Sequence, residues 1–589
     1  MRDRLRGGGR GEQRAKHNRQ QGKDNENDIP KILAHKDSPV VLRRIPCDTL
    51  RRDYNIHKTG DFSMNLSRFK PLAGFLAIFL LGAIARAWQF GTIPPGISAD
   101  EASIGLDAYY LLTYGVDRYG MSYPVHLISW GSGQNALYAY LIMPVIALNE
   151  LNIDSIRLPM LVAGILSLPL IYLVGRKIVN EQFGLIAMFL LAISPWHVIA
   201  SRWAVESNIF PFVFLAGFTL FLYSDNANRF FVAACASFGL SMYAYGTSYA
   251  AVPIFLSISV PLWIYTKRMR FAQAILGLGV FLLVSLPILV FIAVNVLSLP
   301  GARLGSLTIP RLPVEARYIS LGSMFDQTPL QKMGENAQTL WRLLWTQTDD
   351  FAWNRVKPFG YFYTVTFPLA LLGLSFSLAR IYRKTQRAEY HLLLLAWLLA
   401  SVCIGLINPV NLTRVNLIFT PLILYIGLFL FELKERIPPA LPVGGAVLLL
   451  AFFLFQRAYY GTEHQRKLRV AFNSGIIPAI EFAVEKSEDA AVCFTETVPS
   501  SYVYVLFSQK PGPSALAQEM RSAEWLYPFD YPQNPARYPR QLGQFHFKTE
   551  DCKTDPNAMY ILLLGETPPT DLDYRIKKFD RFQVYLPKE

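Results

Sequence analysis

The feature that most constrains this chain is a succession of long apolar segments, separated by short polar segments that carry basic residues. A helix needs about 20 mostly apolar residues to cross a bilayer. The first such segment runs from Leu72 to Trp88, and others follow as far as residue 456. Of the 589 residues, 52% are hydrophobic, which is too apolar for an ordinary soluble enzyme with this charge content. The sequence therefore predicts a mainly α-helical, polytopic transmembrane protein.

The basic residues predict how the chain is oriented. Lys and Arg exceed Asp and Glu by 14, but they lie in short clusters between apolar runs, so nucleic acid is not an expected partner. Cytoplasmic loops are enriched in Lys and Arg. The apolar segment from Ala136 to Leu148 is too short for a span. If it does not cross, the later basic clusters all fall inside: Arg176-Lys177, Arg229, Lys267 to Arg270, Arg380 to Arg387 and Lys434 to Arg436.

This topology has about eleven spans, with the N-terminus cytoplasmic and the C-terminus outside. The predicted spans are 72–88, 158–174, 183–199, 207–223, 230–246, 248–265, 271–296, 359–379, 391–407, 413–431 and 440–456. The expected location is the plasma (inner) membrane. Membrane lipids are therefore expected partners.

Three regions follow from the topology. Residues 1–63 are polar and basic with few aromatic residues, which predicts a disordered cytoplasmic tail. Two alternatives stay open for this tail: it contacts anionic lipid, or the true start is Met64. Residues 64–458 form the membrane domain, with a first outer loop at about 91–157 and a long outer loop at about 298–358. Residues 459–589 form an extracytoplasmic domain.

The extracytoplasmic domain has an α/β pattern. IIPAIEFAVEKSED predicts an amphipathic helix, and four apolar runs predict strands: AVCFTE, SYVYVLFSQ, AMYILLLGE and RFQVYL. The domain has no Gly-rich phosphate loop, so no nucleotide is expected. Cys493 and Cys552 share this region and could form a disulfide in an oxidising compartment.

Two polar groupings lie at the predicted outer ends of early spans. Asp100 and Glu101 follow the first span closely, and acidic residues near the bilayer are candidates for function. The alternative is a pair of solvated loop carboxylates. SPWHVIASRWAVESN then places His197, Arg202 and Glu206 at the outer junction of the third and fourth spans, where Arg202 and Glu206 could instead form a structural ion pair.

Two later groupings fall on the same predicted face. NPVNLTRVN contributes Asn411 and Arg414 at a span junction. The long outer loop contains DDFAWNRVKPFGY, with Asp349, Asp350, Arg355 and Lys357. Four polar groupings therefore converge on one face of an otherwise apolar protein.

Three segments carry a resemblance to a known family: DEASIGLDAYYLL, SIRLPMLVAGILSLPLIYLVGRK and SPWHVIASRWAVESNIFPF. They resemble the glycosyltransferase family 39 or aminoarabinose-transferase-like group, relatives of the dolichyl-phosphate-mannose protein mannosyltransferases in the GT-C superfamily. The resemblance covers roughly Met64 to Gln456 and is strongest before about residue 260. It implies a GT-C type membrane fold and a polyprenyl-phosphate sugar as the donor.

The resemblance also implies roles for individual residues. Asp100 matches the catalytic carboxylate of the first outer loop, with Glu101 supporting substrate or acceptor binding. Glu206 matches a second acidic position where Asp is commoner. Arg414 matches a basic position that faces the lipid-linked phosphate. The resemblance also implies, with less specificity, that His197, Arg202 and Arg355 bind substrate. Asn411 is a further expected substrate-binding residue, because it lies in the same segment as Arg414.

The expected chemistry suits these residue types. A phosphate leaving group needs a cation such as Arg414 or Arg355. A hydroxyl acceptor needs a base, and Asp100 can take its proton as the acceptor attacks. One displacement inverts the anomeric carbon, and no second carboxylate is needed as an acid. Glu101 and Glu206 could hold sugar hydroxyls or a divalent cation, although the resemblance requires no metal or other cofactor.

Two other classes of function remain as alternatives. A transporter or flippase of lipid-linked saccharides would also need many spans, but its ionisable residues usually lie near the bilayer midplane. A non-catalytic assembly subunit would tolerate substitution of Asp100. The sequence does not identify the sugar, and the acceptor is an unknown hydroxyl-bearing protein, lipid or polysaccharide.

Overall fold

The computed structural model describes residues 70–129, 133–225, 227–313, 328–349, 351–526 and 538–588. The predicted tail at 1–63 and the site residue Asp350 lie outside these ranges. The chain divides into two units, residues 1–64 and 65–589. All the contacts described below lie within the second unit.

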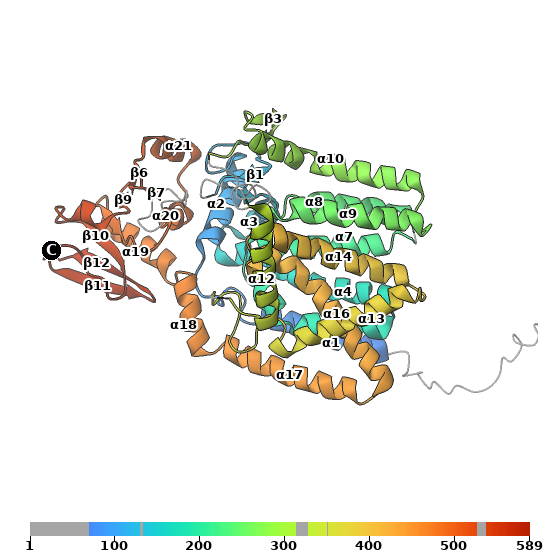
Figure 1. The fold of residues 1–589 in the computed structure, drawn as a ribbon. Coiled ribbons are helices and arrows are strands. Elements are labelled where there is room, and N and C mark those ends of the chain that lie inside the picture. The colour runs from blue at the N-terminus through green and yellow to red at the C-terminus, as the bar shows by residue number, and fades with distance from the viewer. Residues whose placement is uncertain are drawn as a thin grey trace, which may run out of the picture. The chain divides into compact units, whose positions relative to one another are not determined.

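Helices occupy all eleven predicted spans, which confirms the mainly α, polytopic fold (Figure 1). Among the described residues, seven helical segments are long and apolar enough to cross a membrane. They are α4 (Ile153–Ile178), α9 (Ser248–Tyr265), α10 (Phe271–Val296), η3 with α13 (Thr364–Tyr382), α14 (Ala388–Ile407), α15 to α16 (Leu412–Arg436) and α17 (Ala440–Tyr459). The other four predicted spans contain α1 (Lys70–Ala87), α5 (Glu181–Ile193), α7 (Glu206–Leu222) and α8 (Asn228–Ser241).

One span begins later than predicted. The sequence places its start near residue 359, but α13 (Phe367–Tyr382) follows a short 3-10 turn, η3 (Thr364–Thr366). The aromatic residues before it are buried in a loop, where Trp196 donates its backbone N–H to the Tyr361 carbonyl at 2.7 Å. Hydropathy alone cannot separate such a buried loop from a span. Pro368 then occupies the first turn of α13, a position that suits proline.

The short apolar segment after residue 136 forms α3 (Leu137–Asn149), a helix of 13 residues that packs on α4 and on α2 (Ala99–Tyr114). A helix of this length rises about 20 Å, which is less than the hydrocarbon thickness. This length agrees with the predicted topology, in which the segment does not cross.

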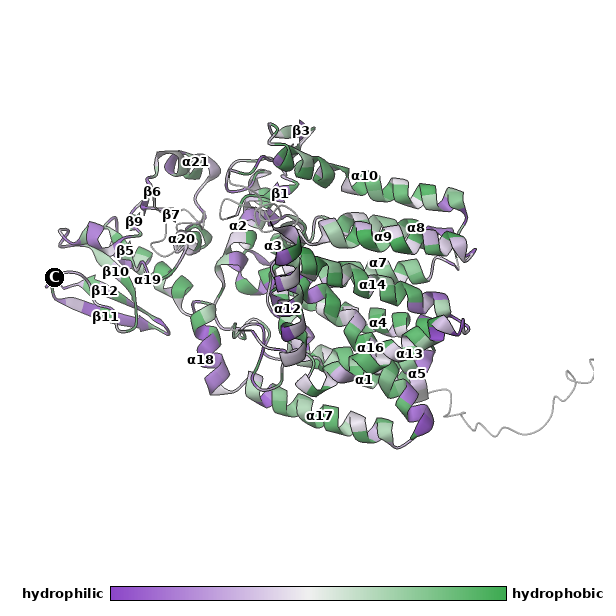
Figure 2. Cartoon of the chain, in the orientation of Figure 1, coloured by the Kyte–Doolittle hydropathy of each residue, from purple (hydrophilic) through white to green (hydrophobic). Residues whose placement is uncertain are grey.

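Helix α4 joins two charged ends of the membrane domain. Near its start, Arg157 pairs with Glu101, and near its end Lys177 pairs with Asp225. The helix rises about 30 Å between Arg157 and Lys177, which matches the bilayer core. We call these the Asp100 end (Asp100, Glu101, Arg157) and the Lys177 end (Lys177, Asp225, Arg268, Glu389). Polar residues gather at the ends of the spans, with apolar residues between them (Figure 2).

The predicted basic clusters meet at the Lys177 end. Arg268, from the α9–α10 turn, pairs with Asp225 at 3.3 Å and also with Glu389 in α14. Arg387 donates to the carbonyls of Lys177 and Val179. Ion pairs therefore connect basic clusters that are far apart in the sequence, as expected if they share one side of the membrane.

The segment predicted as the long outer loop contains a hairpin of β3 (Ala302–Leu304) and β4 (Leu307–Ile309), followed by the helix α12 (Pro329–Thr346). In Figure 1, α12 runs across the direction of the spans. Its Trp341 and Trp345 rings are half exposed, and their centroids lie 5.8 Å apart. Exposed indoles on an amphipathic helix are typical of a membrane interface.

The C-terminal region forms an α/β domain. Its six-stranded sheet has the order β11 (Tyr574–Phe579), β12 (Phe582–Pro587), β10 (Met559–Leu563), β5 (Val492–Phe494), β9 (Phe545–His546), β8 (Gln541–Leu542). A separate pair contains β6 (Trp525–Leu526) and β7 (Tyr538–Pro539). The helices are α18 (Thr462–Ala471), α19 (Ile476–Ser487), α20 (Tyr502–Gln509) and α21 (Pro513–Ser522).

Most of the predicted elements of this domain are confirmed, but one is wrong. IIPAIEFAVEKSED forms α19, and AVCFTE, AMYILLLGE and RFQVYL form β5, β10 and β12. SYVYVLFSQ forms the helix α20 and not a strand. Residues Tyr502 to Phe507 are all buried, because α20 lies between α2 and α19, and a short apolar run buried on every side shows no period to distinguish a helix from a strand.

The predicted cysteine pairing is present. Cys493 in β5 and Cys552, 59 residues later, form a disulfide with a Cα–Cα distance of 6.4 Å. Both residues are buried. The bond joins the central strand of the sheet to the segment before β10.

Candidate active site

Asp100 lies in the first turn of α2, and the local sequence fixes where that turn begins. Ser98 is the N-cap: its hydroxyl accepts from the Glu101 N–H at 3.2 Å, while its own N–H donates to Glu101 Oε2 at 3.0 Å. This capping box satisfies two donors that a helix start otherwise leaves unpaired. A carboxylate in the first turn is also stabilised by the helix dipole. Asp100 is half buried, so α2 holds it at a defined place near the protein surface.

Glu101 forms a fully buried ion pair with Arg157. Arg157 Nε lies 2.7 Å from Oε1 and Nη2 lies 2.9 Å from Oε2, and both side chains are 0% exposed. Glu101 also accepts from the Ala204 N–H at 3.1 Å. These bonds give Glu101 a structural role next to Asp100. Direct contact of Glu101 with substrate stays a prediction.

Arg157 also holds the chain that leads into α2. It donates to the carbonyls of Pro94 at 2.7 Å and Gly96 at 2.8 Å. Gly96 has φ +82°, and a Cβ there would lie 2.3 Å from the Phe472 carbonyl oxygen, so only glycine fits. Arg157 was not identified as a site residue from the sequence. The feature that could have identified it is its place as a lone arginine at the start of an apolar span, in the sequence Arg157-Leu158-Pro159.

Arg202 and His197 lie in a buried network. Arg202 donates to the carbonyls of Arg86 at 2.6 Å, Gln89 at 2.9 Å and Ile93 at 3.0 Å, so it fixes the chain after α1. His197, in the short helix α6 (Pro195–Ala200), is hydrogen-bonded through Nδ1 to Arg86 Nη2 at 2.8 Å. Arg86 was also not identified as a site residue from the sequence. Contact of Arg202 or His197 with substrate stays a prediction.

Glu206 is the first residue of α7. It forms no ion pair with Arg202, which was the structural alternative in the sequence analysis, because the Arg202 guanidinium donates to backbone carbonyls instead. Its Oε2 accepts from the Asn135 N–H at 2.5 Å, and Asn135 is in the short strand β2 (Gln134–Asn135). The Asn135 side chain in turn donates to the Tyr249 hydroxyl at 3.0 Å. Glu206 is half buried. These contacts tie the start of α7 to the first outer loop.

Arg414 and Asn411 form a small capped turn. Asn411 is the N-cap of α15 (Leu412–Val415), and its Oδ1 accepts from the Arg414 N–H at 2.9 Å. The Arg414 guanidinium is half buried and donates to the Pro409 carbonyl at 3.2 Å. In the described part of the chain, no carboxylate lies within ion-pairing distance of it. Asn416 donates to the Ser207 carbonyl at 2.8 Å, so this turn lies beside the Glu206 segment.

Arg355 is held in the loop before α13. Its Nε donates to the Asp349 carbonyl at 2.7 Å and lies 3.8 Å from Asp349 Oδ1. Asn354 donates to the other oxygen of the Asp349 carboxylate at 2.6 Å. Burial raises the pKa of Asp349. Arg355 therefore already has one acidic partner, Asp349, at the long distance of 3.8 Å.

Trp203 joins three of the groupings. Its indole N–H donates to the Ser98 hydroxyl at 3.4 Å, and its ring centroid lies 6.3 Å from that of Trp353. The Asp100 turn, the 197–207 segment and the Arg355 loop are therefore neighbours. With the Asn416–Ser207 bond, the contacts connect all four predicted polar groupings at the Asp100 end.

The C-terminal domain also reaches this end. Helix α20 packs along α2, and the Tyr110 hydroxyl donates to the Pro511 carbonyl. Tyr504 of α20 is buried, and burial together with the charges of Asp100 and Glu101 raises its pKa. Sequence reasoning missed this contact, because it interpreted α20 as a strand.

Among the described residues, no group of three or more His, Cys, Asp and Glu side chains could hold a metal ion. Glu101, one of the two carboxylates considered for a cation, is paired with Arg157. The expectation from the sequence, that no metal is required although a divalent cation could bind, therefore stays a prediction.

The comparisons with known proteins agree with this fold. Residues 135–291 match the family model "Dolichyl-phosphate-mannose-protein mannosyltransferase". ArnT from Cupriavidus metallidurans, in the apo state, is similar with a TM-score of 0.52 at 12% identity, over 88% of this chain and 98% of that one. The chain is therefore a polytopic membrane protein whose fold is similar to that of ArnT, with one segment similar to the mannosyltransferase family.

The Archaeoglobus fulgidus oligosaccharyltransferase gives a TM-score of 0.47 at 14% identity, over 75% of this chain. The match spans 64% of the oligosaccharyltransferase chain, which is less than two thirds of its length. None of the curated proteins compared with the sequence matches it.

Proposed function

We propose that this protein is a glycosyltransferase that moves a sugar from a polyprenyl-phosphate donor to a hydroxyl acceptor on the extracytoplasmic face. The observation that carries the proposal is the capped first turn of α2, which presents Asp100 at the same end of the bundle as Arg414. A base and a cation without a carboxylate partner are the two groups that such a transfer needs. ArnT from Cupriavidus metallidurans binds undecaprenyl phosphate, so a polyprenyl phosphate is the donor class to test first.

The proposed reaction is one displacement with inversion. The acceptor oxygen attacks the anomeric carbon and loses its proton to the Asp100 carboxylate. The bond from the anomeric carbon to the phosphate oxygen breaks, and the polyprenyl phosphate leaves with the electron pair. Arg414 stabilises the departing anion through charge-assisted hydrogen bonds. Glu206 is placed to hold a sugar hydroxyl.

The proposed orientation puts the Asp100 end outside the plasma membrane and the Lys177 end in the cytoplasm. The concentration of Lys and Arg at the Lys177 end supports it, because cytoplasmic ends of spans are enriched in these residues. The disulfide between Cys493 and Cys552 supports it as well, since disulfides persist in oxidising compartments.

The test begins with mass spectrometry of the lipids that copurify with the protein, followed by turnover with the identified donor. Asp100→Asn removes the base and keeps the shape, so we expect turnover to fall about 10²- to 10⁴-fold while donor binding is unchanged. The matched control is Asp154→Asn, which removes an acidic residue from the first turn of α4. Equal turnover of Asp100→Asn and the wild type would exclude Asp100 as the base. Binding of the identified donor without any turnover by the wild type would contradict the transferase and leave a transporter or an assembly subunit.

A further inference from the structure

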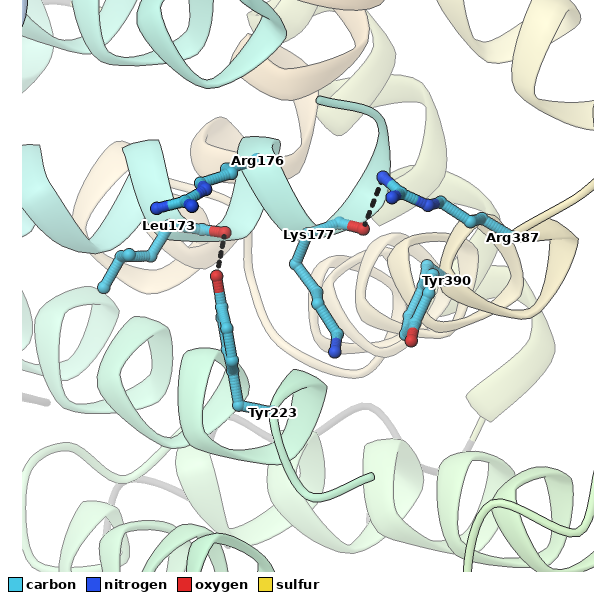
Figure 3. Close-up of a pocket in the computed structure, with 6 residues that line it drawn as sticks. All are labelled: Leu173, Arg176, Lys177, Tyr223, Arg387 and Tyr390. Atoms are coloured by element: carbon cyan, nitrogen blue, oxygen red, sulfur yellow. Dashed lines mark hydrogen bonds between the residues drawn. The ribbon is translucent and has the colours of Figure 1, made fainter. Parts of the chain in front are cut away.

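A polar cavity lies far from Asp100, at the Lys177 end. It has a volume of about 370 Å³ and six lining residues: Leu173, Arg176, Lys177, Tyr223, Arg387 and Tyr390 (Figure 3). The first three come from the last turns of α4, and the others come from the end of α7 and the start of α14. The proposed sugar transfer assigns no role to this cavity.

The cavity has more positive charge than its carboxylates can neutralise. Lys177 Nζ lies 2.8 Å from Asp225 Oδ1, and Arg268 pairs with Asp225 and with Glu389. Two cations and two carboxylates are thereby matched. Arg176 and Arg387 then remain, and in the described ranges neither guanidinium lies within ion-pairing distance of a carboxylate.

The cavity also has a fixed frame. Arg387 donates to the carbonyls of Lys177 and Val179, which ties the α14 start to the α4 end (Figure 3). The Tyr223 hydroxyl donates to the Leu173 carbonyl at 3.3 Å. Lys177 Nζ lies 4.9 Å from the centroid of the Tyr223 ring and 5.5 Å from that of Tyr390. Lys177 and Arg387 are therefore held at the cavity by contacts with neighbouring helices, and Arg176 lines it from the last turn of α4.

The chemistry of the lining selects phosphate. Guanidinium groups bind phosphate oxygens with two parallel hydrogen bonds, and two of them can share one phosphate. The cavity lies about 30 Å along α4 from the Arg157–Glu101 pair, at the depth of lipid headgroups. Basic pockets between spans at this depth suit anionic lipids. Leu173 and the two tyrosine rings provide apolar surface beside the charges, which a lipid can use and a free phosphate cannot.

We propose that this cavity binds the phosphate headgroup of an anionic lipid from the leaflet at the Lys177 end. The site is separate from the sugar-donor site, and its existence does not depend on the proposed reaction. Its occupant neutralises Arg176 and Arg387 and fills the space between α4, α7 and α14.

The experiment compares three forms of the full chain, purified in detergent: the wild type, Arg176→Gln/Arg387→Gln, and the control Arg383→Gln/Lys384→Gln. The control removes two exposed charges from the neighbouring α13–α14 turn that do not line the cavity. Native mass spectrometry measures binding of phosphatidylglycerol, with phosphatidylcholine as the uncharged comparison. A second arm measures thermal stabilisation by inorganic phosphate.

We expect the cavity variant to bind phosphatidylglycerol about tenfold more weakly than the wild type and the control, which is about 1.4 kcal/mol. Loss of stabilisation by inorganic phosphate alone, with lipid binding unchanged, would retain the phosphate site and assign it to a soluble ligand. Equal binding by all three forms in both arms would overturn the proposal. Arg176→Lys/Arg387→Lys keeps the charge, so a well-folded comparison remains if the glutamine variant is unstable.

Discussion

The two charged ends of the membrane domain hold their charges in different ways. At the Asp100 end, Glu101 and Arg157 are 0% exposed, and the pair also bonds to the backbone at Pro94, Gly96, Ser98 and Ala204. At the Lys177 end, Arg268 is 38% exposed and shares the Asp225 carboxylate with Lys177. A buried and fully hydrogen-bonded pair keeps one geometry, as catalysis requires. A partly hydrated network tolerates rearrangement and leaves cations for a ligand.

Glu101→Gln should produce the largest difference between the two ends. The change leaves the Arg157 charge buried without its counter-ion, and breaking a buried pair in this way costs about 3–5 kcal/mol. We expect the free energy of unfolding, measured by titration with a denaturing detergent, to fall by that amount. A loss below about 1 kcal/mol would mean that water reaches this pair and that the contrast between the ends is wrong.

Arg414→Gln tests whether the Asp100 end separates structural from chemical charges. Arg414 is half buried and has no carboxylate partner among the described residues, so we expect its loss to lower turnover about 10²-fold with little change in stability. Arg414→Lys should recover part of the activity. Arg342→Gln, at an exposed position of α12, is the matched control. An unfolding defect in Arg414→Gln, with normal turnover of the folded fraction, would assign Arg414 to structure.

Glu432→Gln is the same chemical change at the Lys177 end, and it should have the smallest effect. Glu432 pairs with Arg380, and the two side chains are 19% and 27% exposed. Partly hydrated ion pairs contribute about 0–1 kcal/mol to the free energy of unfolding. In 1 M salt the Debye length is about 3 Å, so the attraction between the two charges is largely screened. We expect a loss below 1 kcal/mol that disappears in 1 M salt, measured by the same titration. A loss as large as that of Glu101→Gln would show that the two ends are equally rigid.

The membrane fold was predictable because each span is specified by its own length and apolarity, and basic clusters orient the spans without knowledge of packing. α20 and the late start of α13 were not predictable in this way. SYVYVLFSQ and the residues before Phe367 are apolar because tertiary contacts bury them, and a short apolar run does not reveal which contacts these are.

The meeting of the four polar groupings at one end was predictable from the sequence, but the contacts that hold them together were not. Asp100, Glu206 and Arg414 stand out as charges beside apolar runs. Glu101, next to Asp100, pairs with Arg157, and Glu206 accepts from Asn135. Each partner lies tens of residues away along the chain, so only the folded chain shows these pairs. Arg202 resembled a ligand-binding cation, yet its donors meet three backbone carbonyls.

The fixed length of α4 between the paired residues Arg157 and Lys177 also sets the bilayer thickness that suits the protein best. Arg157 and Lys177 cannot approach each other without breaking a helix, so a thinner or thicker bilayer must be met by tilting the protein or by deforming the lipid. Either response costs a fraction of a kcal/mol per Å of mismatch. Reconstitution in lipids of different acyl length should therefore alter how the Asp100 end meets the water boundary, where the proposed lipid-linked donor would present its phosphate.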